Sequence, residues 1–243
     1  MTDNQQHLSE LPGKDKKEKV RNMFNSIAKN YDFLNHFLSF GVDYHWRNQV
    51  LKIIKSKDPK HILDVATGTG DLAILATKSN AEKIVGIDIS EAMLEVGIKK
   101  VEKKGLNSII ELKQADSEDL PFDDNTFDLA MVAFGVRNFE DLEKGLSEIK
   151  RVIKENGTLI VLEFSHPRKA PIKQLYNFYS ANILPVLGKA ISNDSSAYTY
   201  LPESVKRFPA YDEFTDVMKK VGFRNTEYKA LSFGISSIHI GEK

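Results

Sequence analysis

The chain has 243 residues, of which 41% are hydrophobic and 28% are charged, and its 34 Lys and Arg residues balance 34 Asp and Glu residues. This composition is typical of a folded globular chain, and zero net charge gives no global electrostatic footprint for nucleic acid. Because the chain has no cysteine, disulfides, thiolate metal sites and a cysteine nucleophile are excluded.

The N-terminal residues are polar and charged and lack the apolar stretch of a signal peptide. We expect residues 1–19 to form a flexible tail and residues 20–243 to form a single domain. The longest apolar-rich run, residues 127–136, is too short to span a membrane, so a cytoplasmic protein is expected. Residues 20–55 carry a helical pattern with Phe33, Phe37 and Phe40 on one apolar stripe.

From residue 61 onward, short apolar runs alternate with segments of helical periodicity. Strands are predicted at residues 61–66, 83–87, 108–113, 127–133 and 157–164, and helices at residues 71–78, 93–101 and 141–153. Ser90 is the predicted N-cap of the second of these helices. Strands that alternate with helices imply βαβ units and a parallel sheet covered on both faces.

Residues 167–209 interrupt this alternation, because the segment is rich in aromatic residues and proline. We expect a helical insertion here that caps the pocket, then a last helix near residues 211–221 and two strands at residues 223–228 and 235–240. The predicted fold class is therefore α/β. It is a Rossmann-like, doubly wound and mostly parallel sheet with an antiparallel last strand, preceded by N-terminal helices.

The sharpest local signal follows the first predicted strand and has the sequence Asp64-Val65-Ala66-Thr67-Gly68-Thr69-Gly70-Asp71. Glycines in such a turn let the backbone approach a ligand closely, in the crevice at the carboxyl ends of the strands. Asp88 ends the second strand 24 residues after Asp64, where a carboxylate can accept both ribose hydroxyls of an adenosine group. Because Gly68-x-Gly70-x-x-Ala73 also fits a relaxed dinucleotide fingerprint, a nicotinamide-dependent oxidoreductase is one alternative.

Three features favour S-adenosylmethionine over a dinucleotide. Asp64, four residues before Gly68, would repel a pyrophosphate but favours the ammonium and sulfonium groups of S-adenosylmethionine. Asp116 follows the third strand and can accept the adenine amine, while the backbone at Ser117 can reach the ring. Finally, the sequence has one apparent nucleotide-binding half and no second βαβαβ unit for a nicotinamide.

Longer stretches carry a resemblance to a known family. They are Tyr31-Asp32-Phe33-Leu34-Asn35 with Ser39 and Trp46, Phe134-Gly135-Val136-Arg137-Asn138, and Arg151-Val152-Ile153-Lys154 through Leu162-Glu163-Phe164-Ser165. From about Val20 to its end, the chain resembles the ubiquinone/menaquinone biosynthesis C-methyltransferases, which are class I S-adenosylmethionine-dependent enzymes. Two positions depart from that pattern: Asp43 replaces a histidine, and Glu155-Asn156-Gly157 replaces a Pro-Gly-Gly turn.

The resemblance implies S-adenosylmethionine as methyl donor, with contacts at Thr69, Asp88, Asp116 and Ser117, whereas Ala133 replaces a serine that supplies a further contact in the family. It implies methylation of a ring carbon of a prenylated quinol, and we favour demethylmenaquinol as the acceptor. A methoxy-benzoquinol of the ubiquinone route, or another small lipophilic or phenolic acceptor, is the alternative. A non-catalytic S-adenosylmethionine-binding module is a third interpretation.

Methylation of a quinol carbon requires a donor aimed at the developing oxyanion and a base for the hydroxyl proton. Arg137, after the fourth strand, is the candidate oxyanion stabiliser, because arginine does not act as a base. No base is singled out among the candidates Tyr31, Asp32, His36, His45 and His166. The six histidines show no metal-ligand spacing, so no metal is expected.

The prenyl tail of such an acceptor needs an apolar route. The stripe Phe33, Phe37 and Phe40 and residues 176–187 are the candidate walls of that route. Substrate solubility leads to the hypothesis of peripheral contact with the inner membrane surface. The sequence leaves the oligomeric state open, with a homodimer as one alternative.

Overall fold

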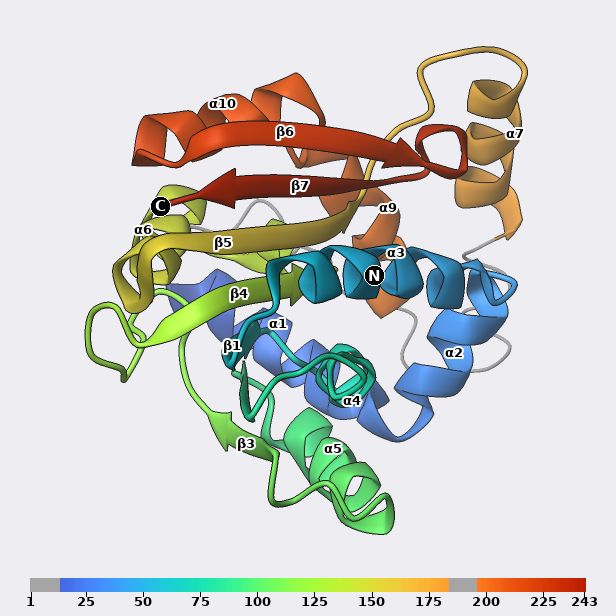
Figure 1. Ribbon diagram of the computed structural model, residues 1–243. Helices are drawn as coiled ribbons and strands as arrows, with labels where there is room; N and C mark the ends of the chain where they lie inside the picture. The colour runs from blue at the N-terminus through green and yellow to red at the C-terminus, as the bar shows by residue number, and fades with distance from the viewer. Residues whose placement is uncertain (1–13, 184–195) are drawn as a thin grey trace.

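Seven strands form one sheet in the order β3-β2-β1-β4-β5-β7-β6, within residues 14–183 and 196–243 that this computed structural model describes (Figure 1). The strands are β1 (His61–Val65), β2 (Lys83–Asp88), β3 (Ile110–Gln114), β4 (Phe127–Ala133), β5 (Ile153–Phe164), β6 (Arg224–Leu231) and β7 (Ser236–Glu242). β1 to β5 pair in parallel, whereas β7 runs antiparallel to β5 and β6. The predicted Rossmann-like sheet with an antiparallel end is therefore confirmed.

Helices cover the sheet, with α3 in front of it and α6 behind it in Figure 1. They are α1 (Lys14–Ile27), α2 (Tyr31–Leu38), α3 (Val42–Lys57), α4 (Asp71–Ala76), α5 (Glu91–Lys103), α6 (Leu142–Val152), α7 (Ile172–Phe178), α9 (Ser196–Arg207) and α10 (Asp212–Val221). In the parts of the chain described, no helix combines the length and the hydrophobicity needed to cross a lipid bilayer.

The central strands β1, β2, β4 and β5 are buried on both faces, as their sequences require. Successive side chains of a strand point to opposite faces. Along β1, Ile62 belongs to the same core cluster as Ile54 of α3, whereas Leu63 belongs to the cluster that contains Leu146 of α6. All four side chains are fully buried. Strands covered on both sides carry continuous apolar runs, and those runs are the signal that located them.

Helix α1 begins at Lys14, inside the segment expected to be a flexible tail. Residues 14–19 are helical instead, and the reason lies in the residues that follow. Val20, Met23 and Ile27 recur at helical spacing and are buried in a cluster with residues of α5 and α9. The charged residues before Val20 form the first turns of that same amphipathic helix. Residues 1–13 lie outside the described part of the chain.

Strand β5 begins earlier than predicted, at Ile153. The turn-forming pair Asn156-Gly157 does not end the strand, because Asn156 adopts a left-handed φ of 63° within a bulge in the pairing of β5 with β4. The helical insertion is confirmed over its described residues, which form α7, a π-helical turn (Tyr179–Ile183) and α9.

Candidate functional site

The glycine-rich loop after β1 is held by Asp88 at the end of β2. Oδ2 of Asp88 accepts the N–H of Gly68 at 2.8 Å, and Oδ1 accepts the N–H of Ser90 at 2.8 Å. Burial raises the pKa of the Asp88 carboxyl, and these backbone donors oppose that rise. Gly68 and Gly70 adopt φ values of 57° and 78°, which favour glycine. The loop geometry is therefore set before any ligand binds.

A pocket with an empty volume of about 720 Å³ lies at the carboxyl ends of β1, β2, β3 and β4. Four of the predicted contact residues line it together, namely Gly68, Asp88, Asp116 and Ser117. Parallel strands end at one edge of the sheet, so residues far apart in sequence meet there. Asp88 accepts backbone bonds from Gly68, Ser90 and Ile89, which does not use all the lone pairs of its two oxygens and leaves acceptor capacity for ligand hydroxyls.

The loops after β1 and β4 approach each other closely beside this pocket. A Cβ atom placed on Gly135 would lie 2.6 Å from the Cβ atom of Ala66, so a larger residue does not fit there. Ala66 and Phe134 both adopt left-handed φ values, 54° and 59°, which are unfavourable for residues other than glycine. Such strain is typical of a loop shaped for a ligand.

Lys17 of α1 covers the predicted adenine end of the pocket. Its Nζ lies 2.6 Å from Oδ2 of Asp116 and 3.4 Å from Oε2 of Glu118. Glu118 is buried and also accepts the N–H of Glu140 at 2.7 Å. Sequence reasoning missed Lys17 because it lies in a charge run that is typical of a solvated tail.

Asp64 lies in β1, just before the glycine-rich loop, and does not line the pocket. Its Oδ2 accepts the Thr67 hydroxyl at 2.6 Å, and the side chain is almost fully buried. Burial raises the pKa of Asp64 to about 7, against the bonds from Thr67 and the backbone of Ala73. Asp64 therefore shapes the loop, and its contact with a bound cation stays a prediction.

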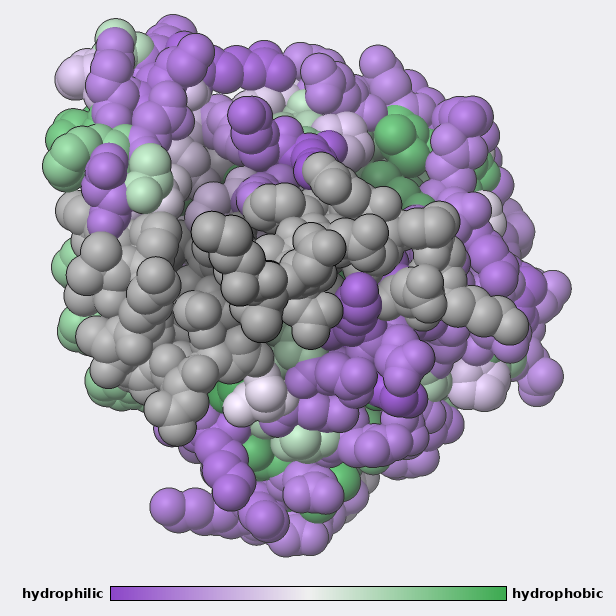
Figure 2. Space-filling view, turned by 180° about the vertical axis from the view of Figure 1, so that it is seen from behind, coloured by the Kyte–Doolittle hydropathy of each residue, from purple (hydrophilic) through white to green (hydrophobic). Residues whose placement is uncertain are grey.

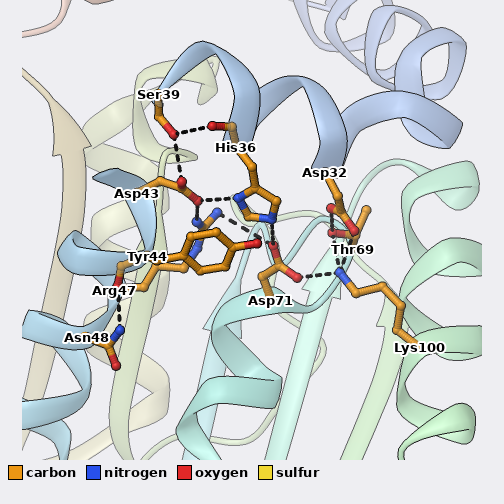
Figure 3. Close-up of polar contacts among 10 residues, drawn as sticks. All are labelled: Asp32, His36, Ser39, Asp43, Tyr44, Arg47, Asn48, Thr69, Asp71 and Lys100. Carbon is orange, nitrogen blue, oxygen red and sulfur yellow. Dashed lines mark hydrogen bonds and ion pairs between the residues drawn. The ribbon is translucent and has the colours of Figure 1, made fainter. Parts of the chain in front are cut away.

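Thr69 and Gly70 also do not line the pocket. The Thr69 hydroxyl bonds to Asp32 of α2, and Nζ of Lys100 lies 2.7 Å from the Asp32 carboxylate (Figure 3). Lys100 also pairs with Asp71 at the start of α4. These four side chains, the Asp32 network, connect α2, α4 and α5 to the glycine-rich loop.

Asp43 stands where the family pattern has histidine, and Figure 3 shows it at the other end of the same polar cluster. It accepts bonds from Ser39 at 2.7 Å and from Arg47, and Nδ1 of His36 lies 2.7 Å away. Burial works to raise the pKa of Asp43, but the Ser39 bond and the charges of Arg47 and His36 outweigh it and lower the pKa. Asp43 thus joins α2 to α3.

Two base candidates are therefore engaged in structural contacts: Asp32 with Lys100 and Thr69, and His36 with Asp43. Across residues 14–183 and 196–243, no group of three or more His, Asp or Glu side chains is placed to hold a metal ion.

Arg137 lies just after β4, in the short helix Val136–Asn138, and its side chain is 6% exposed. Its Nη1 donates to Oε1 of Glu163 at 2.8 Å, and its guanidinium carbon lies 5.6 Å from the centre of the Phe164 ring. Burial raises the pKa of Glu163, while the charge of Arg137 opposes that rise. The Nε of Arg137 is buried without a hydrogen-bond partner.

Three tyrosines are close enough to Arg137 to respond to its charge. Burial raises the pKa values of Tyr31, Tyr176 and Tyr200, and Arg137 opposes each rise. Tyr31 also lines the pocket, and the Tyr200 hydroxyl donates to Oδ1 of Asn138 at 3.1 Å. The tyrosines come from α2, α7 and α9, so the N-terminal helices and the insertion enclose this side of the site.

The predicted aromatic stripe lies on the surface: Phe33 and Phe37 on α2 and Phe40 in the turn after it are all exposed. Its role as a wall of a prenyl route stays a prediction. Of the other candidate wall, residues 176–183 are described and residues 184–187 lie outside the described part of the chain.

Comparison with known proteins agrees with this architecture. A sequence model of the ubiE/COQ5 methyltransferase family matches residues 13–243. A demethylmenaquinone methyltransferase of Bacteroides fragilis is 47% identical over 94% of each chain. A demethylmenaquinone methyltransferase of Thermus thermophilus is 44% identical over 91% of this chain and 100% of its own. A ubiquinone/menaquinone biosynthesis C-methyltransferase of Geotalea daltonii is 46% identical over 94% and 98%.

Solved structures with low sequence identity share the fold. A SAM-dependent methyltransferase from Thermotoga maritima superposes with a TM-score of 0.65 at 21% identity, covering 91% of this chain and 99% of its own. The cyclase SpnF superposes with a TM-score of 0.67 at 15% identity, covering 93% and 96%. Because one fold carries different chemistries, these structures identify the fold and not the reaction. The pocket, the loop sequence and the match over nearly the whole length agree: the chain belongs to the ubiE/COQ5 methyltransferase family.

Proposed function

We propose that this methyltransferase transfers a methyl group from S-adenosylmethionine to a ring carbon of demethylmenaquinol, forming menaquinol. The observation that carries the proposal is a nucleotide-type pocket beside a buried guanidinium and three tyrosines. Relatives named demethylmenaquinone methyltransferase, 44–47% identical to this chain, support the choice of acceptor. The benzoquinol of the ubiquinone route is the second candidate, because other relatives carry both quinones in their names.

The residues of the pocket fit the donor. Asp88 has free lone pairs for the ribose hydroxyls, and Asp116 with the backbone of Ser117 faces the adenine end. Gly135 lets the loops after β1 and β4 meet beside the donor pocket, because a Cβ there would lie 2.6 Å from that of Ala66. When bound, the donor supplies an electrophilic methyl group on a sulfonium, which is displaced in line.

The role assigned to Arg137 is to bind the quinol oxygen and stabilise the negative charge that develops on it. Arginine stays protonated at ordinary pH, so it cannot remove the hydroxyl proton. The buried Glu163 fixes the guanidinium, and the low-dielectric surroundings strengthen its effect on an anion. The tyrosines on α2, α7 and α9 exclude water from the reacting ring.

Turnover of Arg137→Leu tests this assignment. We expect turnover to fall at least tenfold, which corresponds to about 1.4 kcal/mol of barrier, while adenosylhomocysteine affinity measured by calorimetry is unchanged. Arg224→Leu, an exposed arginine on β6, is the matched control. Unchanged turnover of the Arg137 variant would remove this residue from the mechanism.

The quinone profile of cells lacking this chain tests the acceptor. Accumulation of a naphthoquinone lighter by one methyl group supports demethylmenaquinol, and accumulation of a lighter benzoquinone supports the second candidate. Because a prenyl tail keeps either acceptor in the bilayer, we also propose that the protein works in peripheral contact with the membrane.

A further inference from the structure

Large apolar side chains are exposed along one edge of the molecule. They are Phe33 (60% exposed), Phe37 (45%), Phe40 (78%), Leu175 (62%), Phe178 (60%) and Phe233 (82%). We call these six side chains the aromatic rim. They come from α2, the turn between α2 and α3, α7 and the turn between β6 and β7, which lie on the right of Figure 1. Seen from behind, hydrophobic residues gather along the same edge, at the left of Figure 2.

The α2 and α7 parts of the rim form one connected surface. The rings of Phe33 and Phe37 stack with their centroids 5.7 Å apart. Phe40 approaches Tyr179, directly after α7, with centroids 6.3 Å apart, and the Tyr179 hydroxyl donates to the Leu38 carbonyl at 2.8 Å. Scattered exposed hydrophobic residues are ordinary, whereas a connected group of large ones marks an interaction surface.

The charged residues of the segment 165–183, beside the rim, are all basic. Residues 165–183 contain Arg168, Lys169 and Lys173 but no Asp or Glu, in a chain whose net charge is zero. These three side chains are exposed, and Arg168 has one loose ion pair, 3.7 Å from the equally exposed Asp212. Aromatic residues flanked by basic ones are typical of surfaces that bind anionic lipid headgroups, where each Lys or Arg contributes about 1 kcal/mol.

The same helices face both the rim and the site. Tyr31 on α2 and Tyr176 on α7 are partly buried and feel the charge of Arg137, while Phe33 and Phe178 on those helices are exposed. Each of these two helices therefore carries one aromatic side chain toward Arg137 and another on the outer surface.

We propose that the aromatic rim and the basic residues Arg168, Lys169 and Lys173 form a surface that docks on an anionic lipid bilayer. The proposal rests on the proposed function, because a prenylated acceptor is the reason to approach a membrane. A second copy of this chain fits the surface less well. A symmetric dimer through the rim would bring the same basic residues of both copies together, and like charges oppose such an interface.

Co-sedimentation with vesicles tests the apolar half of the surface. The probes are vesicles of phosphatidylcholine with and without phosphatidylglycerol. We expect the wild type to bind the phosphatidylglycerol vesicles and Phe33→Ser/Phe178→Ser to bind them at least tenfold more weakly. Ile98→Ser is the matched control, because Ile98 is 40% exposed on α5, away from the rim. Equal binding of wild type and the double variant would overturn the proposal.

A second set of variants tests the basic residues of the surface. We expect Arg168→Gln/Lys169→Gln/Lys173→Gln to lose at least tenfold in binding to phosphatidylglycerol vesicles. Lys99→Gln/Lys103→Gln/Lys104→Gln removes the same charge from exposed positions at the end of α5 and should bind like the wild type. Equal loss in both triple variants would refute a localised surface and indicate a response to net charge alone.

Two further measurements separate the ways in which the proposal can fail. Adenosylhomocysteine binding should be unchanged in every variant, which shows that each is folded. Rim variants should keep wild-type turnover on a water-soluble acceptor with a truncated prenyl chain and lose it on acceptor embedded in vesicles. A wild type that docks but never turns over contradicts the proposed function, whereas one that turns over but never docks contradicts the docking surface. Conversion of a dimer to a monomer by rim variants, with vesicle binding unchanged, would assign the rim to a second copy.

Discussion

Replacing Glu163 by Gln tests the buried ion pair at the ends of β4 and β5. The Glu163 and Arg137 side chains are 0% and 6% exposed, and their charged groups are 2.8 Å apart. With an effective dielectric constant of about 20, two unit charges at this distance attract by about 6 kcal/mol, most of which offsets their desolvation. Removing one partner leaves the other charge buried, so we expect Glu163→Gln to lower the free energy of unfolding by about 3–5 kcal/mol.

Urea unfolding of four proteins measures this coupling: wild type, Glu163→Gln, Arg137→Leu and the double variant. Independent sites add to within about 0.5 kcal/mol, but here the double variant should cost clearly less than the two single variants together. Because Glu163 positions Arg137, Glu163→Gln should also reduce turnover without changing adenosylhomocysteine affinity. Additive costs would refute the idea that the pair acts as a unit.

The cost of Arg137→Leu in unfolding free energy should depend on pH. Burial raises the pKa of Glu163 and Arg137 holds it down, so Arg137→Leu should raise this pKa further. A carboxyl with a higher pKa in the folded chain destabilises it as pH rises from the unfolded value, about 4.3, through the folded value. Arg137→Leu should therefore cost less at about pH 5 than at about pH 8. An equal cost at both would contradict an unpaired buried carboxylate.

Three further predictions concern the pocket. Lys17→Met should tighten adenosylhomocysteine binding by up to about fivefold, because the Lys17–Asp116 ion pair, which is partly exposed and worth up to about 1 kcal/mol, no longer competes for Asp116. Weaker binding in calorimetry would show that Lys17 holds the ligand instead. The pKa of Asp64 is raised to about 7, so the contribution of this carboxyl to stability should fall, by on the order of 4 kcal/mol, as pH rises from about 4 to about 7. The difference in unfolding free energy between wild type and Asp64→Asn should therefore change over this pH range in urea unfolding, and a constant difference would contradict the raised pKa. Gly135→Ala should weaken adenosylhomocysteine binding at least tenfold, because its Cβ would lie 2.6 Å from that of Ala66 and separate the two loops; an unchanged dissociation constant would show that the loops adjust.

Local signals were sufficient for much of the fold and for half of the site. The strand at residues 127–133 and the N-cap at Ser90 follow from residues within a few positions of each other. Gly68, Asp88, Asp116 and Ser117 each follow a predicted strand of a parallel sheet, and the carboxyl ends of such strands meet at one edge. The strand pattern and the parallel order of the sheet thus predict that these residues lie close together, although no long-range contact is known from the sequence.

The rest depends on contacts that no local pattern contains. Lys17 reaches Asp116 across 99 positions, and its own neighbourhood is typical of a tail. Glu163 lies within an apolar strand, where its partner Arg137 could be placed only after the register of β4 and β5 was known. The Asp32 network joins four segments and likewise appears only in three dimensions.

Helix α2 is attached to the glycine-rich loop through Asp32 and Thr69, and it presents Phe33 to the outside. A shift of α2 therefore affects the loop, and a shift of the loop affects α2. Membrane binding that shifts α2 would change the affinity for the donor. Thermodynamic reciprocity then requires that donor binding change the affinity for the membrane by the same factor. A membrane that raised donor affinity through this contact would, by the same factor, be bound more tightly by enzyme loaded with donor.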